Sequence, residues 1–149
     1  MKPNSRLTMY LLISGFFLLL DQALKYLART NSDFSFYLWK NWFGWEYMGN
    51  TGVAFSLPMP NIVLLIITPL VLLGVSYFLV SRKKKSNIFI FGGLLFLLGA
   101  VSNYIDRVLF SVTIDYLRIV TGVINLADVM IVVGVVVLFL DEYKKKNKN

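Results

Sequence analysis

The chain has 149 residues, of which 57% are hydrophobic and only 15% are charged, and its formal net charge is +7. This composition excludes an ordinary soluble domain of this length and is typical of a membrane protein. The absence of cysteine and histidine excludes disulfides, a thiol nucleophile and the usual zinc ligands. The positive charges gather at the ends of apolar segments, so we expect them to set membrane topology and expect no nucleic-acid partner.

Four apolar segments predict an all-α membrane protein with four transmembrane helices, at about residues 7–27, 61–81, 87–106 and 123–141. The first segment carries Asp21 and Lys25 four residues apart, and we expect them to form an internal ion pair with a structural role. The basic and apolar start could also be a cleaved signal peptide. No small-residue cleavage site follows it, so we expect a retained helix.

The segment 28–60 contains all three tryptophans and many other aromatic residues, which favour the headgroup level of a bilayer. Two stretches within it, 35–39 and 45–48, have strand-like composition, and residues 41–44 could form the turn between them. We therefore predict a small β-rich aromatic loop lying on the bilayer. A simple interfacial belt of aromatic side chains is the alternative, and it explains the composition equally well.

The distribution of basic residues predicts the orientation of the chain. Ten of the 15 lysine and arginine residues lie near the N-terminus, in the loop 82–85 and in the C-terminal tail. The positive-inside rule then places both termini in the cytoplasm and the loops 28–60 and 107–122 outside. We expect residues 1–149 to form one integral domain in the cell's cytoplasmic membrane.

The third apolar segment has a face of small and polar residues, formed by Gly92, Gly99, Asn103 and Asp106. Small residues allow another helix to approach closely, and the polar residues would then face the bundle interior. For Asp106 and the adjacent Arg107, the more ordinary interpretation is a solvated pair at the membrane surface. Adjacent residues do not face each other on a helix, so Arg107 need not neutralise Asp106.

The fourth apolar segment carries Asn125 and Asp128, which share a helix face, ahead of an apolar run. A helix that begins near residue 123 would place Asp128 in its second turn. A carboxylate inside a membrane is costly, which favours a functional role, and stabilisation of the helix N-terminus is the alternative. Asp115, expected in the loop 107–122, and Asp106 both lie at the outer face, so either could pair with Asp128.

Two close carboxylates in a site of low dielectric cannot easily both ionise, so they titrate as a pair that shares a proton. Such a pair can supply a general base and a general acid. The residues therefore favour acid–base chemistry by paired aspartates, and we expect no metal or other cofactor. A small transporter would need polar residues throughout the membrane depth, whereas the acids of the third and fourth segments gather at one end. A non-enzymatic scaffold is the second alternative.

Taken together, these motifs resemble the lipoprotein signal peptidases (signal peptidase II). In chain order, the matching residues are Asp21 and Lys25; Asn50, Gly52, Ala54 and Phe55; Gly99, Ala100, Asn103, Asp106 and Arg107; Ile114, Asp115 and Tyr116; and Asn125, Ala127 and Asp128. Each motif alone is weak, but five in this order across nearly the whole chain are specific. The chain departs from the family pattern at Gly49, Ser102 and Ile124, where Arg, Gly and Phe are usual.

The resemblance implies a membrane aspartic endopeptidase that removes the signal peptide from prolipoproteins by cleaving before a diacylglyceryl-modified cysteine. It implies Asp115 and Asp128 as the catalytic dyad, and Asp106 remains the alternative partner of Asp128. Site-shaping or substrate-binding roles are implied for Asn50, Gly52, Asn103, Asp106, Arg107, Asn125 and Ala127. The expected partners are lipid-modified prolipoproteins and membrane lipids, and we expect a monomer.

Overall fold

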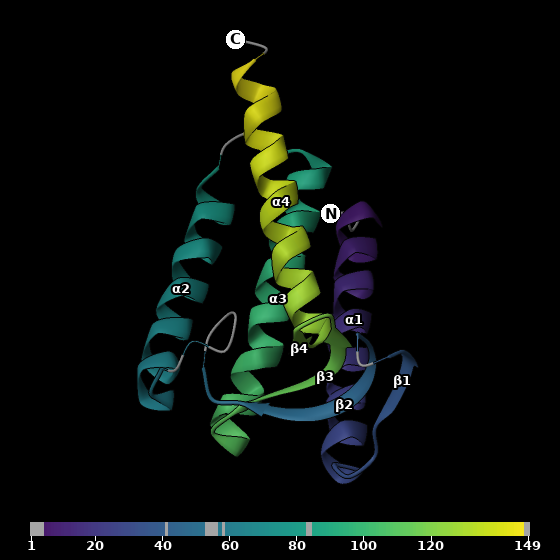
Figure 1. The fold of residues 1–149 in the computed structure, drawn as a ribbon. Coiled ribbons are helices and arrows are strands. Elements are labelled where there is room, and N and C mark those ends of the chain that lie inside the picture. Colours follow the sequence, from purple (N-terminus) through teal and green to yellow (C-terminus); the bar gives the residue numbers. More distant parts are fainter. Residues whose placement is uncertain (1–4, 41, 53–56, 58, 83–84, 148–149) are drawn as a thin grey trace.

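The computed structural model describes residues 5–40, 42–52, 57, 59–82 and 85–147. In these residues the chain forms four helices and a four-stranded sheet that lies across one end of the helical bundle (Figure 1). In chain order the elements are α1 (Ser5–Thr30), β1 (Phe36–Trp39), β2 (Phe43–Asn50), α2 (Asn61–Ser81), α3 (Asn87–Phe110), β3 (Thr113–Ile119), β4 (Gly122–Ile124) and α4 (Leu126–Lys146). The start of α1 and the end of α4 both point away from the sheet.

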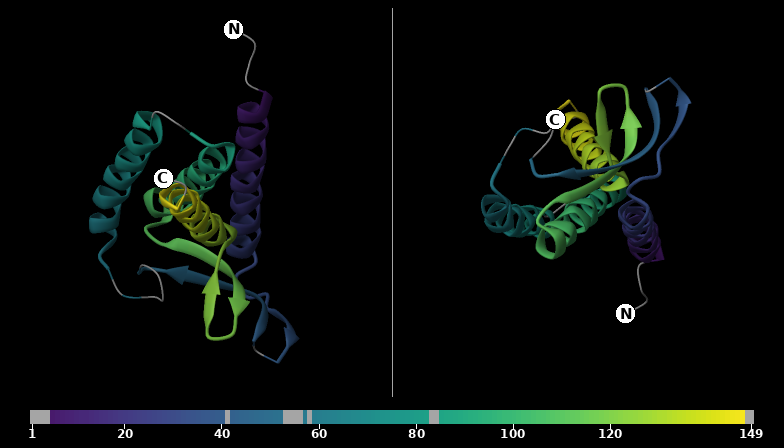
Figure 2. Two further views of the ribbon diagram at one scale, coloured as in Figure 1. Left: turned by 90° about the horizontal axis from the view of Figure 1, so that it is seen from above. Right: turned by 60° about the horizontal axis from the view of Figure 1, so that its bottom comes forward.

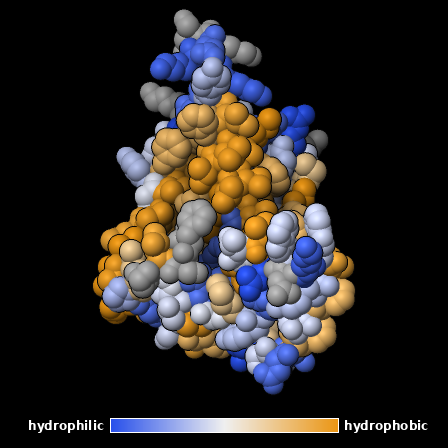
Figure 3. Space-filling view, in the orientation of Figure 1, coloured by the Kyte–Doolittle hydropathy of each residue, from blue (hydrophilic) through white to orange (hydrophobic). Residues whose placement is uncertain are grey.

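Within the described residues, the helices α1, α2 and α3 are long and apolar enough to cross a membrane. Helix α4 is apolar between Asp128 and Asp141 and carries charged residues at both ends. Figure 3 shows a hydrophobic band over the helices, between the hydrophilic end of α4 and the mixed surface around the sheet. This arrangement is that of a multi-pass membrane protein with a polar end.

Helix α3 is central and contacts α1, α2 and α4. Figure 2 shows α1 and α2 on opposite sides of the α3–α4 pair. The predicted seam of small residues is confirmed. A Cβ on Gly99 would lie 2.7 Å from the carbonyl oxygen of Ala127, and a Cβ on Gly134 would lie 2.7 Å from the carbonyl oxygen of Gly92. Small residues therefore let α3 and α4 approach backbone to backbone.

The sheet is antiparallel throughout, in the order β1-β2-β3-β4. The two predicted strands are confirmed as β1 and part of β2. The segment 107–122, expected as an outer loop, holds regular structure that the sequence did not indicate: α3 continues to Phe110, and Thr113–Ile119 forms β3, which pairs with β4. The β-branched and aromatic residues of Thr113–Ile119 suit a strand, and β2 supplies its backbone partners. Asp115 accordingly lies on a strand, opposite Met48.

The predicted helix boundaries are confirmed for 61–81, while α1 is longer than 7–27 at both ends. Helix α4 begins at Leu126 and not near residue 123, because Gly122–Ile124 pair with β3. Asp128 therefore lies in the first turn, and its expected place in the second turn is wrong. Three sets of residues lie outside the described part of the chain: Ala54 and Phe55 of the motif that begins at Asn50, Asn41 of the predicted turn, and residues 83–84 of the basic loop.

Candidate active site

The predicted acidic and amide side chains come together at the sheet end of the bundle. Helices α1 and α3, strand β3 and the first turn of α4 meet there. Most of these side chains are buried, although they are polar or charged. Buried polar groups need hydrogen-bond partners to be tolerated, so the contacts of each one decide what it can do.

Asp115 is 1% exposed and is held by two asparagine side chains. Its Oδ2 accepts a hydrogen bond from Asn50 Nδ2 at 3.0 Å, and its Oδ1 accepts one from Asn125 Nδ2 at 2.6 Å. Burial raises the pKa of Asp115 to about 7, the nearby charge of Asp128 adds to the rise, and the two amide donors oppose it. A carboxyl with this pKa can both hold and release a proton near neutral pH.

Asp128 is the third residue of α4 and forms a capping box with Asn125. Asn125 Oδ1 accepts from the backbone N–H of Asp128 at 2.8 Å, and Asp128 Oδ2 accepts from the backbone N–H of Asn125 at 3.3 Å. The other oxygen, Oδ1, accepts from Asn103 Nδ2 on α3 at 2.8 Å. The capping contact expected as an alternative is therefore present, together with a contact to α3 that a cap does not require.

Asn125 contacts both carboxylates. Its side-chain amide donates to Asp115, and its backbone amide donates to Asp128. The residue is fully buried, so its side chain is fixed by packing as well as by hydrogen bonds. Asp115 and Asp128 are thus placed on two sides of one asparagine, near enough for the charge of Asp128 to raise the pKa of Asp115.

Asp106 lies in a different environment, bound to α1. It forms an ion pair with Lys25 Nζ at 2.8 Å and accepts hydrogen bonds from Gln22 Nε2 and the backbone N–H of Ile114. Asp106 and Arg107 are both buried, so the expectation of a solvated pair at the membrane surface is wrong. Asp106 is covered by α1 and the start of β3, through Lys25, Gln22 and Ile114, whereas Arg107 donates to the carbonyl of Gly52.

The predicted ion pair between Asp21 and Lys25 is confirmed at 2.8 Å. Lys25 Nζ also donates to Asn103 Oδ1 at 2.8 Å, on the same side chain whose Nδ2 binds Asp128. An ammonium group can only donate, so it requires the oxygen of the Asn103 amide to face it and the nitrogen to face Asp128. Lys25 thereby orients the group that holds Asp128.

Two hydroxyl groups that the motif reasoning did not single out bind the carboxylate of Asp21. Ser102 Oγ donates to Oδ2 at 2.6 Å, and the Tyr116 hydroxyl donates to Oδ1 at 2.9 Å. The Tyr116 hydroxyl also accepts from the backbone N–H of Leu126 at 3.0 Å, and burial raises the pKa of Tyr116. In the sequence, Ser102 stands out only as a departure from the family pattern, and Tyr116 only as the neighbour of Asp115.

The remaining predicted site residues hold the backbone around the acids. Gly52 accepts from Arg107 Nη2 through its carbonyl at 2.6 Å and donates to Asn50 Oδ1 through its N–H at 2.9 Å. Ala127 is fully buried, and its N–H donates to Asp21 Oδ1 at 3.1 Å. Among the described residues, no three His, Cys, Asp or Glu side chains are grouped so that they could hold a metal ion.

Comparison with known proteins connects this site to a family. The family described as signal peptidase (SPase) II matches residues 13–144. A lipoprotein signal peptidase of Clostridium novyi is 30% identical over 87% of this chain and 94% of its own length. A lipoprotein signal peptidase of Enterococcus faecalis is 31% identical over 96% of both chains.

Solved structures share the fold. A bacterial membrane enzyme determined at 2.3 Å resolution superposes with a TM-score of 0.86 at 24% identity, covering 95% of this chain and 92% of its own. A second bacterial membrane enzyme, determined at 1.9 Å, gives a TM-score of 0.77 at 25% identity over 90% and 92% of the two chains. The four helices and the sheet are therefore an architecture found in membrane enzymes.

Proposed function

Because this chain belongs to the signal peptidase II family, we propose that it removes the signal peptide from lipid-modified prolipoproteins, with Asp115 and Asp128 as its catalytic dyad. The bond cleaved is the one before the diacylglyceryl-modified cysteine. One observation carries the dyad assignment: Asn125 holds both carboxylates at once. Asp21 and Asp106 also share one residue, but that residue is the cation Lys25, whereas Asn125 is a neutral donor to both members of the proposed dyad.

The proposed chemistry is general acid–base hydrolysis of a peptide bond. The pair carries one proton near neutral pH, because the negative charge of one carboxylate opposes ionisation of the other. The ionised member takes a proton from water, whose oxygen attacks the scissile carbonyl carbon. The protonated member polarises the carbonyl oxygen, and a proton then passes to the leaving nitrogen as the carbon–nitrogen bond breaks. No metal or other cofactor takes part.

The contacts of Asp106 favour Asp115 as the partner of Asp128. Asp106 forms an ion pair with Lys25 at 2.8 Å and accepts hydrogen bonds from Gln22 and from the backbone N–H of Ile114, so its carboxylate is engaged by α1 and β3. Asp115 has only neutral amide donors, from Asn50 and Asn125, and can change its protonation state.

We also propose that all four helices span the cytoplasmic membrane, with both termini in the cytoplasm and the sheet outside. The apolar run of α4 between Asp128 and Asp141 supports the fourth span. The basic residues at the end of α4 support the orientation, since cytoplasmic ends carry excess positive charge. The exposed rings of Phe36, Trp39 and Trp42 then lie at the outer headgroup level, beside the site. The protein works as a monomer at the surface where a lipid-anchored substrate is held.

The test is cleavage of a synthetic peptide that carries a diacylglyceryl cysteine, by the purified full-length protein in detergent micelles. We expect Asp115→Asn and Asp128→Asn each to lower kcat at least 100-fold, since general acid–base groups contribute about 10²–10⁴-fold. Asp33→Asn changes an exposed acid outside the site and serves as the matched control. Full activity in either dyad variant would contradict the assignment.

Three further measurements test the alternatives. Addition of EDTA should leave the rate unchanged, and strong inhibition would point to a metal. Adding Asp106→Asn to the series tests the alternative partner, because that change should affect stability more than the pH dependence of cleavage. A transporter would show proton flux in liposomes that Asp128→Asn abolishes, while both forms fail to cleave the peptide.

A further inference from the structure

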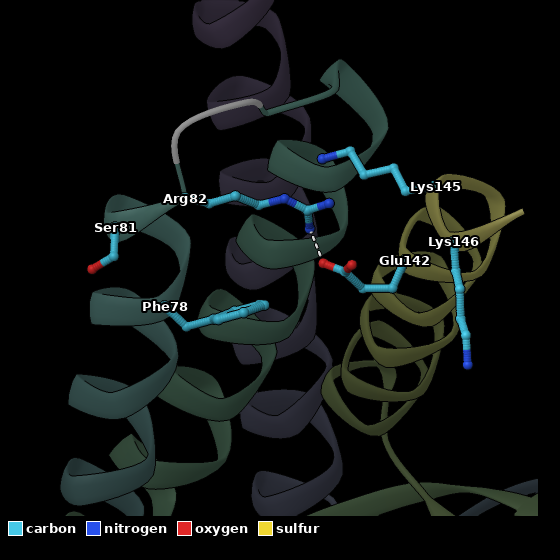
Figure 4. A pocket seen from close by; sticks show the side chains of 6 residues that line it. All are labelled: Phe78, Ser81, Arg82, Glu142, Lys145 and Lys146. Carbon is cyan, nitrogen blue, oxygen red and sulfur yellow. Dashed lines mark ion pairs between the residues drawn. The ribbon is translucent and has the colours of Figure 1, made fainter. Parts of the chain in front are cut away.

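A hollow of about 570 Å³ lies at the end of the bundle opposite the sheet, between the last turns of α2 and α4 (Figure 4). Six residues line it: Phe78, Ser81, Arg82, Glu142, Lys145 and Lys146. A second hollow of about 340 Å³ shares Phe78 and Glu142 with it, so the two adjoin. The proposed dyad is at the other end of the helices, so neither hollow belongs to the site already described.

The first hollow is rich in positive charge. Arg82, Lys145 and Lys146 line it against the single acid Glu142. Figure 4 shows Arg82 extending from the end of α2 toward α4, and Lys145 extending from α4 back toward α2. Arginine and lysine side chains gathered in this way bind phosphate groups.

The Arg82 guanidinium is fixed in place by several contacts. It forms ion pairs with Glu142 and with Asp141 Oδ2, the latter at 3.0 Å, and it lies 3.9 Å from the centroid of the Phe89 ring. Asp141 is in turn held by Ser86 Oγ at 2.5 Å. A preorganised guanidinium loses little conformational freedom when it binds an anion.

The second hollow is apolar and continues toward the middle of the bundle. Its walls come from α2, α3 and α4, through Val75, Phe96, Val135 and Phe139. These side chains present hydrocarbon to whatever fills the space. A soluble anion would use the first hollow alone, whereas a phospholipid would fill both, with its phosphate on the cations and an acyl chain between α2 and α4.

We propose that the two hollows form a binding site for an anionic phospholipid. The phosphate contacts Arg82 and Lys145, Lys146 adds positive charge at the edge of the hollow, and one acyl chain lies along Val135 and Phe139. Basic pockets between transmembrane helices bind lipid headgroups by this combination of charge and hydrocarbon. The site fixes the distance between α2 and the α3–α4 pair at the end of the bundle that the sheet does not hold.

The carboxylate of Glu142 competes with the phosphate for the guanidinium of Arg82. Its carboxylate pairs with Arg82, so a phosphate must displace it. When Glu142 is displaced, Asp141 still holds the guanidinium through the other nitrogen. Removing the charge of Glu142 should therefore strengthen lipid binding, while removing the lysine charges should weaken it.

The experiment is native mass spectrometry of the full-length protein, released from a neutral detergent and titrated with dioleoyl phosphatidylglycerol or dioleoyl phosphatidylcholine. We expect one tightly bound phosphatidylglycerol and no comparable phosphatidylcholine. The double variant Lys145→Gln/Lys146→Gln should weaken phosphatidylglycerol binding about 25-fold, at about fivefold for each lysine near the surface. Its matched control is Lys85→Gln/Lys144→Gln, which removes two charges from the same end outside the hollow.

Two single variants test the competitor and the groove. Glu142→Gln should tighten binding about fivefold, and Asp33→Asn, which changes net charge equally at a distant exposed position, should not. Val135→Trp should fill the groove and weaken binding at least tenfold. Val136→Trp is its control, because Val135 and Val136 are 49% and 50% exposed and only Val135 lines the groove.

Three results would overturn the proposal. Equal binding of the two lipids would show that the headgroup is not recognised. An equal loss in the two lysine pairs would show general attraction between the basic end and anionic lipid. Unchanged phosphatidylglycerol binding in Val135→Trp would show that no acyl chain occupies the second hollow. Thermal unfolding of each variant in the same detergent identifies any change that acts through misfolding.

Discussion

Asn125 Nδ2 lies 2.6 Å from Asp115 Oδ1, and the backbone amide of the same asparagine donates to Asp128. One residue thus joins the strand that carries one acid to the helix that carries the other. The spacing of the two carboxylates depends on this residue more than on any direct contact between them. Substitutions at Asn125 can separate its role as a helix cap from its role as a donor to Asp115.

Asn125→Ser should keep the helix cap and lose the donor to Asp115, whereas Asn125→Ala should lose both. We expect both variants to cleave the lipidated peptide at least tenfold more slowly. Asn125→Ala should in addition lower the free energy of unfolding by about 1 kcal/mol more than Asn125→Ser, because alanine is a poor N-cap. The measurements are peptide cleavage and denaturant titration in micelles. Equal activity in wild type and Asn125→Ser would show that the donor is not needed.

The pKa of about 7 for Asp115 predicts a decline of cleavage on the alkaline side of neutrality. Above that pH the pair loses its shared proton, and no general acid remains. The amide of Asn125 lowers the pKa of Asp115, so its loss in Asn125→Ser should move the alkaline limb of the pH–rate profile upward. A cleavage rate that does not change between about pH 6 and about pH 9 would contradict a proton on Asp115.

The same pKa predicts how stability depends on pH. The pKa of Asp115 is raised above its unfolded value, so the folded state binds the proton more tightly, and this stabilisation is complete below about pH 4. It should be lost progressively as the pH rises from about 4 through 7, and Asp115→Asn should show no such loss. The measurement is the thermal unfolding midpoint of both forms across this range. The prediction would be wrong if the unfolding midpoint of wild type rose relative to that of Asp115→Asn as the pH increased.

Gly99→Ala should separate α3 from α4, because the new Cβ would lie 2.7 Å from the carbonyl oxygen of Ala127. We expect a loss of about 1–3 kcal/mol in the free energy of unfolding, as for other overpacked sites. Cleavage should fall more than tenfold, since Asn103 and Asp128 bridge the same two helices. Gly74→Ala is the control, because a Cβ there meets nothing within 4 Å. If Gly74→Ala caused similar losses, the effect would come from replacing a glycine within a helix and not from the contact between α3 and α4.

The two hydroxyls on Asp21 should be energetically coupled. Ser102→Ala and Tyr116→Phe each remove one donor from a buried carboxylate, and each should cost about 1–3 kcal/mol. The double variant should differ from the sum of the singles by at least about 0.5 kcal/mol, because both donors bind one group. Tyr77→Phe changes an exposed hydroxyl and should be neutral. Additive losses would show that the two contacts act independently.

The sequence is sufficient for the existence of the helices and for the seam of small residues, because these follow from apolar segments and from the spacing of glycines on one helix face. It was insufficient for β3, whose residues look like a short loop until β2 offers them backbone partners. It also misplaced the start of α4, since the hairpin takes residues 122–124. The burial of Asp106 depends on contacts with α1 and β3, and that of Arg107 on a contact with Gly52, none of which a local pattern of α3 encodes.

The two acids of the proposed dyad belong to different kinds of structure, Asp128 to a helix of the bundle and Asp115 to a strand of the sheet at its end. Asp128 takes its position when α4 packs against α3, whereas Asp115 takes its position only when β3 pairs with β2. As long as β3 is not paired with β2, the proposed dyad is therefore incomplete, even where α3 and α4 are already packed together.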